Sequence, residues 1–248
     1  MNGLTFNGTH SGTLGLIMSS KNRPMLPEPK TVYEDLPGID GEYDYSAVNP
    51  DGRVKYMPVV HEVEFAFAER SMAAVRTKAR QIAAWLAVGE KQLIFDDEPG
   101  VYWLATVVNK LDIEGQFTAA RRITVQFRCR PMAYATALTT ITQIVTGTTN
   151  IALTNPGWYV RPVIRITGSC TSFTITCGGK ALACSQALLD SEVEIDFEAM
   201  QAIKDDSINI NNKCSGEFLE LAPGANTITI TGVSLNFTAV VEYRARYL

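Results

Sequence analysis

Apolar and polar residues alternate along short stretches in the first half of the chain. Val63, Phe65 and Phe67 are separated by Glu64 and Ala66. The same spacing recurs over residues 122–130, at Ile123, Val125, Phe127 and Cys129. Side chains two residues apart lie on the same face of a strand, so both stretches are predicted to be half-buried strands. Residues 91–95 and 101–110 flank an acidic turn at 96–100 and predict a hairpin.

The spacing changes to that of a helix over residues 71–88. Six apolar side chains recur at intervals of three and four and form one stripe: Met72, Val75, Ala79, Ile82, Trp85 and Leu86. We expect this stripe to be part of the core. Ser71 is the predicted N-cap, because its hydroxyl can accept from an amide of the first turn. Gly89 is predicted to end the helix in the left-handed conformation.

The segment 21–37 contains four prolines: Pro24, Pro27, Pro29 and Pro37. Proline has no amide hydrogen and a fixed φ, so this segment cannot form a helix or the centre of a sheet. We expect it to run extended over a surface, either of this chain or of a neighbour. A turn at residues 38–41 follows.

The second half of the chain is rich in Thr, Ile, Asn and Gly and contains many short apolar runs. Strands are predicted at 158–167, 172–177, 193–197, 207–210, 227–231 and 236–247, with turns at 155–157, 177–180 and 223–226. Closely spaced strands with regular turns indicate a β-sandwich or jelly roll. The composition shift places a domain boundary near residues 131–137, giving predicted domains 1–131 and 132–248.

The composition argues against several classes of protein. With 248 residues, 46% apolar, the chain is long enough to bury a core without disulfides or metal. A net charge of −4 argues against a general nucleic-acid binder. No apolar run is long enough to span a membrane, and the first residues lack the pattern of a signal peptide. The five cysteines form no Cys-x-x-Cys pair, so we expect free thiols in a reducing compartment.

Motifs that would indicate catalysis are scarce. His10 and His61 are the two histidines, and neither has the spacing of a metal site or a catalytic triad. Three acids, Glu192, Glu194 and Asp196, alternate with apolar residues, which predicts a solvated strand face rather than facing carboxylates. The turn Asp96-Asp97-Glu98 lacks the spacing of an EF-hand. We therefore predict no catalytic, cofactor-binding or metal-binding residues.

Aromatic residues offer a second possible chemistry. Trp158 and Tyr159 follow an Asn-Pro-Gly turn, and exposed rings at the mouth of a β-sandwich can stack on sugars. The alternative, which we favour, is that these rings are buried at the start of a core strand. Trp103 is likewise expected to be structural.

The order of motifs along the chain resembles that of a known family. It runs from Phe6-Asn7-Gly8 through Arg23-Pro24 and Leu36-Pro37-Gly38-Ile39-Asp40-Gly41 to the helix end Ile82-Ala83-Ala84-Trp85-Leu86. It continues with Lys91-Gln92-Leu93-Ile94-Phe95, Asp97-Glu98-Pro99-Gly100-Val101-Tyr102, Arg161-Pro162-Val163-Ile164-Arg165-Ile166, the turn 219–228 and the ending 241–248. This arrangement resembles the distal tail proteins of long non-contractile-tailed phages that infect Gram-positive bacteria.

The resemblance implies a fold and a role. The implied fold is mainly β with one helix: an N-terminal β-sandwich-like ring domain that carries the helix, and a C-terminal galectin-like β-sandwich. The implied assembly is a ring of six copies at the tail tip, which joins the tail tube to the tail-tip and receptor-binding proteins. No cofactor, enzymatic activity, nucleic-acid partner or membrane insertion is implied. The protein would be assembled in the bacterial host cytoplasm and reside in the virion.

A second hypothesis is a carbohydrate-binding protein that uses the C-terminal sandwich to recognise host cell-wall glycans. It requires exposed aromatic rings near Trp158 with polar side chains around them.

Overall fold

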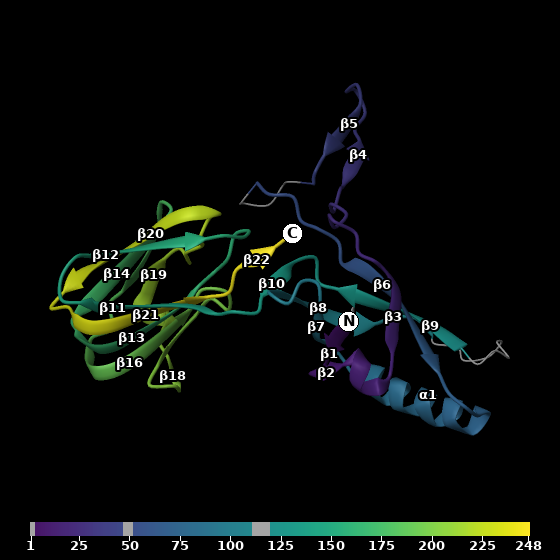
Figure 1. Ribbon diagram of the computed structural model, residues 1–248. Helices are drawn as coiled ribbons and strands as arrows, with labels where there is room; N and C mark the ends of the chain where they lie inside the picture. The colour runs from purple at the N-terminus through teal and green to yellow at the C-terminus, as the bar shows by residue number, and fades with distance from the viewer. Residues whose placement is uncertain (1–2, 47–51, 111–119) are drawn as a thin grey trace. The chain divides into compact units, whose positions relative to one another are not determined.

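Figure 1 shows a computed structural model of the protein, which describes residues 3–46, 52–110 and 120–248. Met1 and Asn2, which begin the N-terminal segment that lacks the pattern of a signal peptide, lie outside these ranges. The chain divides into two compact units, Met1–Ala133 with Leu248 and Tyr134–Tyr247. Strands dominate both units, and the described residues contain one α-helix. The predicted fold class, mainly β with one helix, is confirmed.

The N-terminal unit is built on an antiparallel sheet with the strand order β2-β1-β7-β8-β9-β6-β3. These strands are β1 (Leu4–Phe6), β2 (Thr9–His10), β3 (Ile17–Asn22), β6 (Val59–Ala68), β7 (Lys91–Phe95), β8 (Val101–Val107) and β9 (Ala120–Cys129). The short 3-10 helix η1 (Ser11–Leu14) follows β2. The strands β6 and β9 pair from Val59↔Cys129 to Ala68↔Ala120. Their alternating apolar residues therefore face the same side, as the sequence pattern predicts.

The helix α1 (Met72–Leu86) covers the apolar face of this sheet. Ser71 caps it as predicted, its Oγ accepting from the amide of Ala74 at 3.2 Å. Trp85 is 7% exposed, and its ring lies edge-on to Phe6 and Phe65 with centroids 6.2 Å away in both cases. Its indole N–H donates to the buried carbonyl of Phe6 at 2.9 Å. The helix is thus fixed to β1 and β6 by both packing and a hydrogen bond.

Two details of the helix prediction are wrong. Met72 is 54% exposed, so the buried stripe begins at Val75. The sulfur of Met72 instead contacts the guanidinium of Arg121 at 3.2 Å. The helix ends at Leu86, and its C-cap is Ala87, whose φ of −77° is not left-handed and whose amide donates to the Ala83 carbonyl. Gly89 is therefore not the helix stop.

Most of the proline-containing segment lies outside the main sheet, as predicted. Within 21–37, the first two residues belong to β3, an edge strand of that sheet. A separate hairpin follows, made of β4 (Tyr33–Asp35) and β5 (Glu42–Asp44), and it projects from the rest of the N-terminal unit (Figure 1). Its turn contains Gly38 and Gly41 with φ of 91° and 81°, a conformation that glycine adopts without strain.

The C-terminal unit is a β-sandwich of two antiparallel sheets. One has the order β11-β21-β13-β16-β17-β18 and the other β12-β20-β14-β15-β19. The first contains β11 (Thr139–Val145), β13 (Val163–Cys170), β16 (Leu188–Asp196), β17 (Gln201–Lys204), β18 (Ile208–Asn209) and β21 (Asn236–Tyr243). The second contains β12 (Thr149–Asn155), β14 (Ser172–Cys177), β15 (Lys180–Cys184), β19 (Cys214–Gly216) and β20 (Gly224–Val233). The remaining short elements are η2 (Asn211–Lys213), β10 (Ala133–Ala135) and β22 (Arg246–Tyr247).

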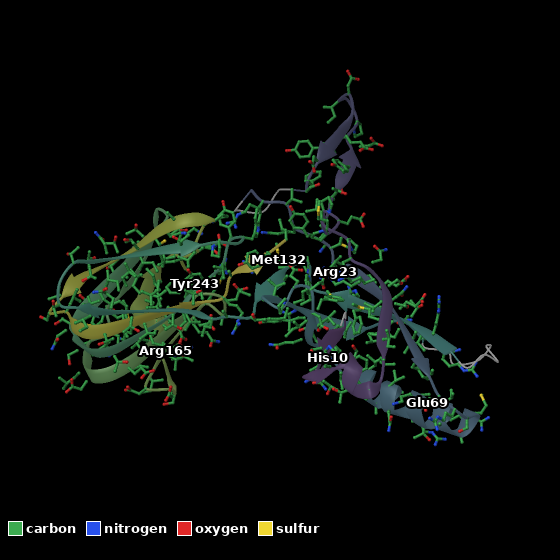
Figure 2. The ribbon with its side chains drawn as sticks, in the orientation of Figure 1. His10, Arg23, Glu69, Met132, Arg165 and Tyr243 are labelled. Atoms are coloured by element: carbon green, nitrogen blue, oxygen red, sulfur yellow. The ribbon has the colours of Figure 1, made fainter. Side chains whose placement is uncertain are left out.

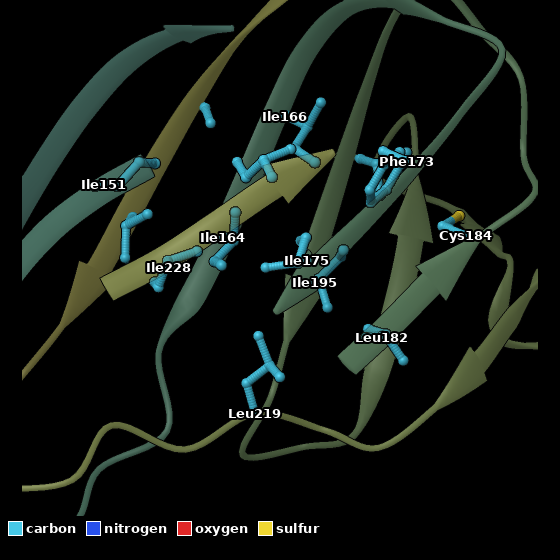
Figure 3. Close-up of a cluster of buried hydrophobic side chains, with 14 of the residues drawn as sticks. Ile151, Ile164, Ile166, Phe173, Ile175, Leu182, Cys184, Ile195, Leu219 and Ile228 are labelled. Carbon is cyan, nitrogen blue, oxygen red and sulfur yellow. The ribbon is translucent and has the colours of Figure 1, made fainter. Parts of the chain in front are cut away.

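The core of the sandwich is aliphatic. Figure 3 shows Ile164, Ile195 and Ile175 meeting between the two sheets, and all three are fully buried. The turn 177–180 connects β14 and β15 as predicted, with Gly178 and Gly179 both at positive φ. Two consecutive residues at positive φ are typical of a type I′ hairpin turn.

Some C-terminal strands differ from their predictions. The strand predicted at 158–167 begins at Val163, because Pro162 has no amide hydrogen with which to extend the sheet hydrogen bonding. The predicted strand 236–247 is divided into β21 and β22. The alternation did not indicate β11, β12, β15, β17 or β19. The strands β11 and β12 form one edge of each sheet and contain no charged residue.

One titratable side chain is buried in the N-terminal unit without a hydrogen-bond partner. His61 on β6 is 2% exposed, and neither ring nitrogen has a partner among the described residues. Its ring lies edge-on to Phe95 and Trp103, with centroids 5.9 and 5.2 Å away. Burial, helped by the charge of Arg23, lowers the pKa of His61 from 6.5 to about 4. His61 is therefore neutral in the folded protein near pH 7.

We predict that Trp85→Ala strongly destabilises the N-terminal unit. The substitution leaves a cavity and removes the partner of the Phe6 carbonyl, which together cost about 3–5 kcal/mol. Arg76→Ala, on the exposed side of the same helix, is the matched control. Urea denaturation of both variants tests this, and equal midpoints would show that the helix does not depend on Trp85.

We also predict that His61 makes stability depend on pH. The unfolded chain binds a proton at His61 below pH 6.5, whereas the folded chain binds it only below about pH 4. Above pH 6.5 His61 is neutral in both the folded and the unfolded chain and costs no stability. As the pH falls from 6.5 to 4, the unfolded chain gains a proton that the folded chain does not bind, so the free energy of unfolding decreases.

The substitution His61→Phe tests this dependence. Between pH 7 and 4.5, wild type should lose about 2 kcal/mol more unfolding free energy than the variant. Parallel losses in the two proteins would contradict the role of His61.

Candidate interaction surfaces

The two histidines have separate structural roles. His10 Nδ1 accepts from the amide of Gly12 at 3.0 Å, which leaves the proton on Nε2 to donate to Asp96 at 3.1 Å. This contact fixes the start of η1. His61 is part of the buried cluster described above. Within the described ranges, no three His, Cys, Asp or Glu side chains gather as metal ligands would.

Two carboxylates of the acidic row on β16 have partners in the described structure. Glu194 accepts from Arg165 on β13 at 2.7 Å, and Arg165 also pairs with Glu242 on β21. The carboxylate of Asp196 accepts from the amides of Glu198 and Ala199 at 2.8 and 2.9 Å. The row is half-exposed, and its apolar neighbours are fully buried. The predicted solvated strand face is confirmed, with Arg165 as its central cation.

Trp158 and Tyr159 do not start a core strand. They lie in the loop before β13, half-buried and edge-to-face at 5.5 Å. The buried Asn155 holds this loop: its amide nitrogen donates to the Trp158 carbonyl at 2.7 Å, and its oxygen accepts from Gly157 at 3.2 Å. The prediction of fully buried rings is wrong, and the two rings cover part of each other instead of forming an open stacking platform.

The acidic turn between β7 and β8 binds two cations of the same unit. Asp97 pairs with Lys21 and, at 3.0 Å, with Arg23, while Glu98 pairs with Arg23 at 3.2 Å. The hydrogen bond from Lys21 lowers the pKa of the Asp97 carboxyl. This turn therefore anchors the chain where it leaves β3, at the position of the Arg23 label in Figure 2.

Arg23 also covers aromatic rings. Its guanidinium carbon lies 4.5 Å from the centroid of Phe95 and 5.6 Å from that of Trp103, within the range of cation–π attraction. A cavity of about 280 Å³ opens beside it, with His61, Trp103 and Pro27 among its lining residues. Trp103 is thus structural in that it supports Arg23, although it also borders this cavity.

Beyond Arg23 the chain exposes an unusual number of apolar side chains. We call residues 23–46 and 52–57 the arm. Backbone hydrogen bonds join its outgoing and returning segments: the amide of Lys30 donates to the carbonyl of Lys55 at 2.7 Å, and the amide of Met57 donates to that of Glu28 at 2.8 Å. Met25 is 94% exposed and Leu26 59%. The further exposed apolar residues are Val32, Tyr33, Leu36, Ile39, Tyr43, Val54 and Met57.

An apolar surface of this kind is typical of protein–protein contacts. The ion pairs of Arg23 fix the base of the arm, whereas the apolar side chains beyond it are exposed. No helix in the described ranges has the length and apolar character needed to span a membrane.

Comparison with known proteins identifies the N-terminal unit. Residues 12–129 match the family model of the phage tail protein RIFT-related domain. No curated protein sequence matches the chain. Among solved structures, the chain is similar to the Dit (gp 19.1) protein of phage SPP1, described as a paradigm of the hub adsorption apparatus in phages infecting Gram-positive bacteria. Identity is 16%, the similarity covers 100% of both chains, and the TM-score is 0.78.

The family match and the fold agree with the resemblance found in the sequence motifs. The match covers most of the N-terminal unit, including the arm, α1 and the strands β6 to β9. The structural similarity extends this agreement through the C-terminal sandwich. Residues 12–129 therefore belong to the phage tail RIFT-related domain family, and the whole chain has the fold of the hub protein Dit of phage SPP1.

Proposed function

We propose that this protein is the hub of a phage or prophage tail tip, a ring of six copies that joins the tail tube to the tail-tip and receptor-binding proteins. The observation that carries this proposal is the phage tail domain match combined with the hub-protein fold over the full chain. The role is structural. Assembly would occur in the bacterial host cytoplasm, where the five free cysteines stay reduced, and the protein would then reside in the virion.

The arm is the part of the chain best suited to contact a neighbouring copy. Burying Met25 and Leu26 against another subunit removes apolar surface from water, at roughly 25 cal/mol per Å². The ion pairs of Arg23 and Asp97 fix the base of the arm, so binding costs little conformational entropy there. A head-to-tail contact of this kind closes into a ring when its rotation matches the symmetry.

The two compact units are proposed to be separate domains, 1–131 for the ring and 132–248 for the outer sandwich. Each has its own buried cluster, centred on Phe65 and Phe127 in the first and on Ile164 and Ile195 in the second. Separate clusters of this size allow each unit to fold by itself.

Oligomeric state tests the ring and the arm together. We expect the full chain to form particles of six times 27.2 kDa in light scattering and six-fold rings in negative-stain images. The double variant Met25→Asp, Leu26→Asp should shift the protein to monomers that remain folded, because both side chains are exposed within the chain. Leu189→Asp, at an 83% exposed position on the other unit, is the matched control.

The outcomes of this experiment separate two claims. Rings that persist in the arm variant would contradict the role of the arm. A wild-type chain that stays monomeric at millimolar concentration would contradict a ring that forms by itself.

Limited proteolysis tests the domains. We expect a first cut within residues 131–137 and two stable fragments, because one buried cluster is made of residues that precede this segment in the sequence and the other of residues that follow it. Mass spectrometry identifies the ends. One resistant core trimmed at its termini alone would contradict the division.

A further inference from the structure

Two cysteines face each other directly at one edge of the C-terminal sandwich. Cys184 on β15 is the register partner of Cys214 on β19. The neighbouring pairs carry the hydrogen bonds of this ladder: Ser185 donates to Lys213 at 2.9 Å, and Glu217 donates to Ala181 at 2.8 Å. Cys184 and Cys214 therefore occupy a non-hydrogen-bonded position, where side chains of antiparallel strands approach most closely.

The geometry of this position suits a disulfide. At non-hydrogen-bonded pairs the Cα atoms are typically about 4.5 Å apart, which lies within the range of about 4.4–6.8 Å found for disulfides. Both side chains lie on the face of the sheet that contacts the core, as Figure 3 shows for Cys184 beside Leu182. A bond between them would need no shift in strand register.

The pair also has suitable chemistry. A hydrogen bond from Cys214 lowers the pKa of the Cys184 thiol to about 7, while the same interaction and burial raise the pKa of Cys214. Cys184 is thus partly thiolate at neutral pH, and the thiolate is the form that reacts. Cys214 is half-buried on a three-residue edge strand, which gives a small oxidant access to the pair.

The other three cysteines are less reactive. Cys129, Cys170 and Cys177 are at most 5% exposed, as is Cys184 at 2%, but none of the three is paired in register with another cysteine. Burial raises the pKa of Cys129 to about 12 and also raises those of Cys170 and Cys177. They are therefore expected to remain thiols under conditions that oxidise the pair.

We propose that Cys184 and Cys214 form an oxidation site that is a dithiol in a reducing environment and a cross-strand disulfide after exposure to a peroxide. The Cys184 thiolate attacks one oxygen of hydrogen peroxide, the O–O bond breaks, and hydroxide leaves. The resulting sulfenic acid is attacked by the sulfur of Cys214, the S–S bond forms, and the S–O bond breaks. The thiol proton of Cys214 leaves with this oxygen as water. The proton that Cys184 lost on ionising combines with the hydroxide to form a second water, so two thiols and one peroxide give one disulfide and two waters.

The disulfide would link two strands of the second sheet and close a loop that passes through the first sheet. The segment between the two cysteines contains β16, β17, β18 and η2, which belong to or flank the first sheet, while β15 and β19 belong to the second. Closing this loop restricts the unfolded chain and raises the melting temperature of the C-terminal unit by about 5 °C or more. This chemistry does not depend on the proposed function. If the protein is a virion component, release from the reducing host cytosol would be the occasion for it.

Thiol counting on the full chain tests the proposal. Protein kept in a reducing buffer and then desalted should show five thiols in a denaturing titration. After mild treatment with hydrogen peroxide it should show three, with a mass loss of about 2 Da that dithiothreitol reverses. A non-reducing digest should contain one linked peptide pair that joins Cys184 to Cys214.

Two variants provide controls. Cys177→Ser should still lose two thiols and gain the same thermal stability, whereas Cys214→Ser should form no intramolecular disulfide and show no gain. A wild-type protein that keeps five thiols, that gains oxygen mass without a link, or that links Cys184 to Cys170 would overturn the proposal. Ring formation is measured separately, so failure here leaves the proposed function untouched.

Discussion

The position of the Trp85 ring is the constraint on which the N-terminal unit depends. Its ring touches Phe6 on β1 and Phe65 on β6, strands that are not neighbours in the sheet, and its N–H satisfies a buried carbonyl. One side chain therefore links the helix to two distant places in the sheet. Because the helix covers the apolar face, the burial of Phe127 and Val125 also follows from this placement.

Charge and aromatic surface meet at Arg23, where the body ends and the arm begins. The guanidinium is shared between the acidic turn and the faces of Phe95 and Trp103, so it is held from two sides. Burial is the main cause of the lowered pKa of His61, and the nearby charge of Arg23 lowers that pKa further. Arg23 is thus held by ion pairs and by ring contacts, whereas the apolar residues that follow it, Met25 and Leu26, are exposed.

The sequence predicts strongly periodic elements well and weakly periodic ones poorly. The strands β6 and β9 alternate sharply because one face of each is core, and α1 has a clear apolar stripe. The strands β11 and β12 are rich in threonine, which suits both faces of a strand, so their alternation is faint. The prolines predict that the arm leaves the sheet, but Met25 and Leu26 look like core residues in a sequence, and their exposure follows from tertiary structure.

The candidate sites show the same limit. The even spacing of Cys170, Cys177 and Cys184 draws attention to that series, yet the partner of Cys184 is Cys214, thirty residues further on. Register between β15 and β19 is set by a chain that leaves one sheet and returns to it, and no local pattern encodes such a return. The family resemblance, in contrast, rests on the order of many turns and strands, and order along the chain is what a sequence preserves.

The uncharged edge strands β11 and β12 are more exposed to unwanted pairing in an assembly than in a single chain. Edge strands without charge or proline readily pair with other strands, and a dilute solution suppresses such encounters by distance alone. The proposed ring would remove that protection, because tethering would hold the sandwiches of adjacent copies at an effective concentration of the order of millimolar. The spacing between copies would then determine solubility: such a ring would have to be wide enough that each sandwich meets its neighbour too rarely, or at too poor an angle, for backbone pairing to spread.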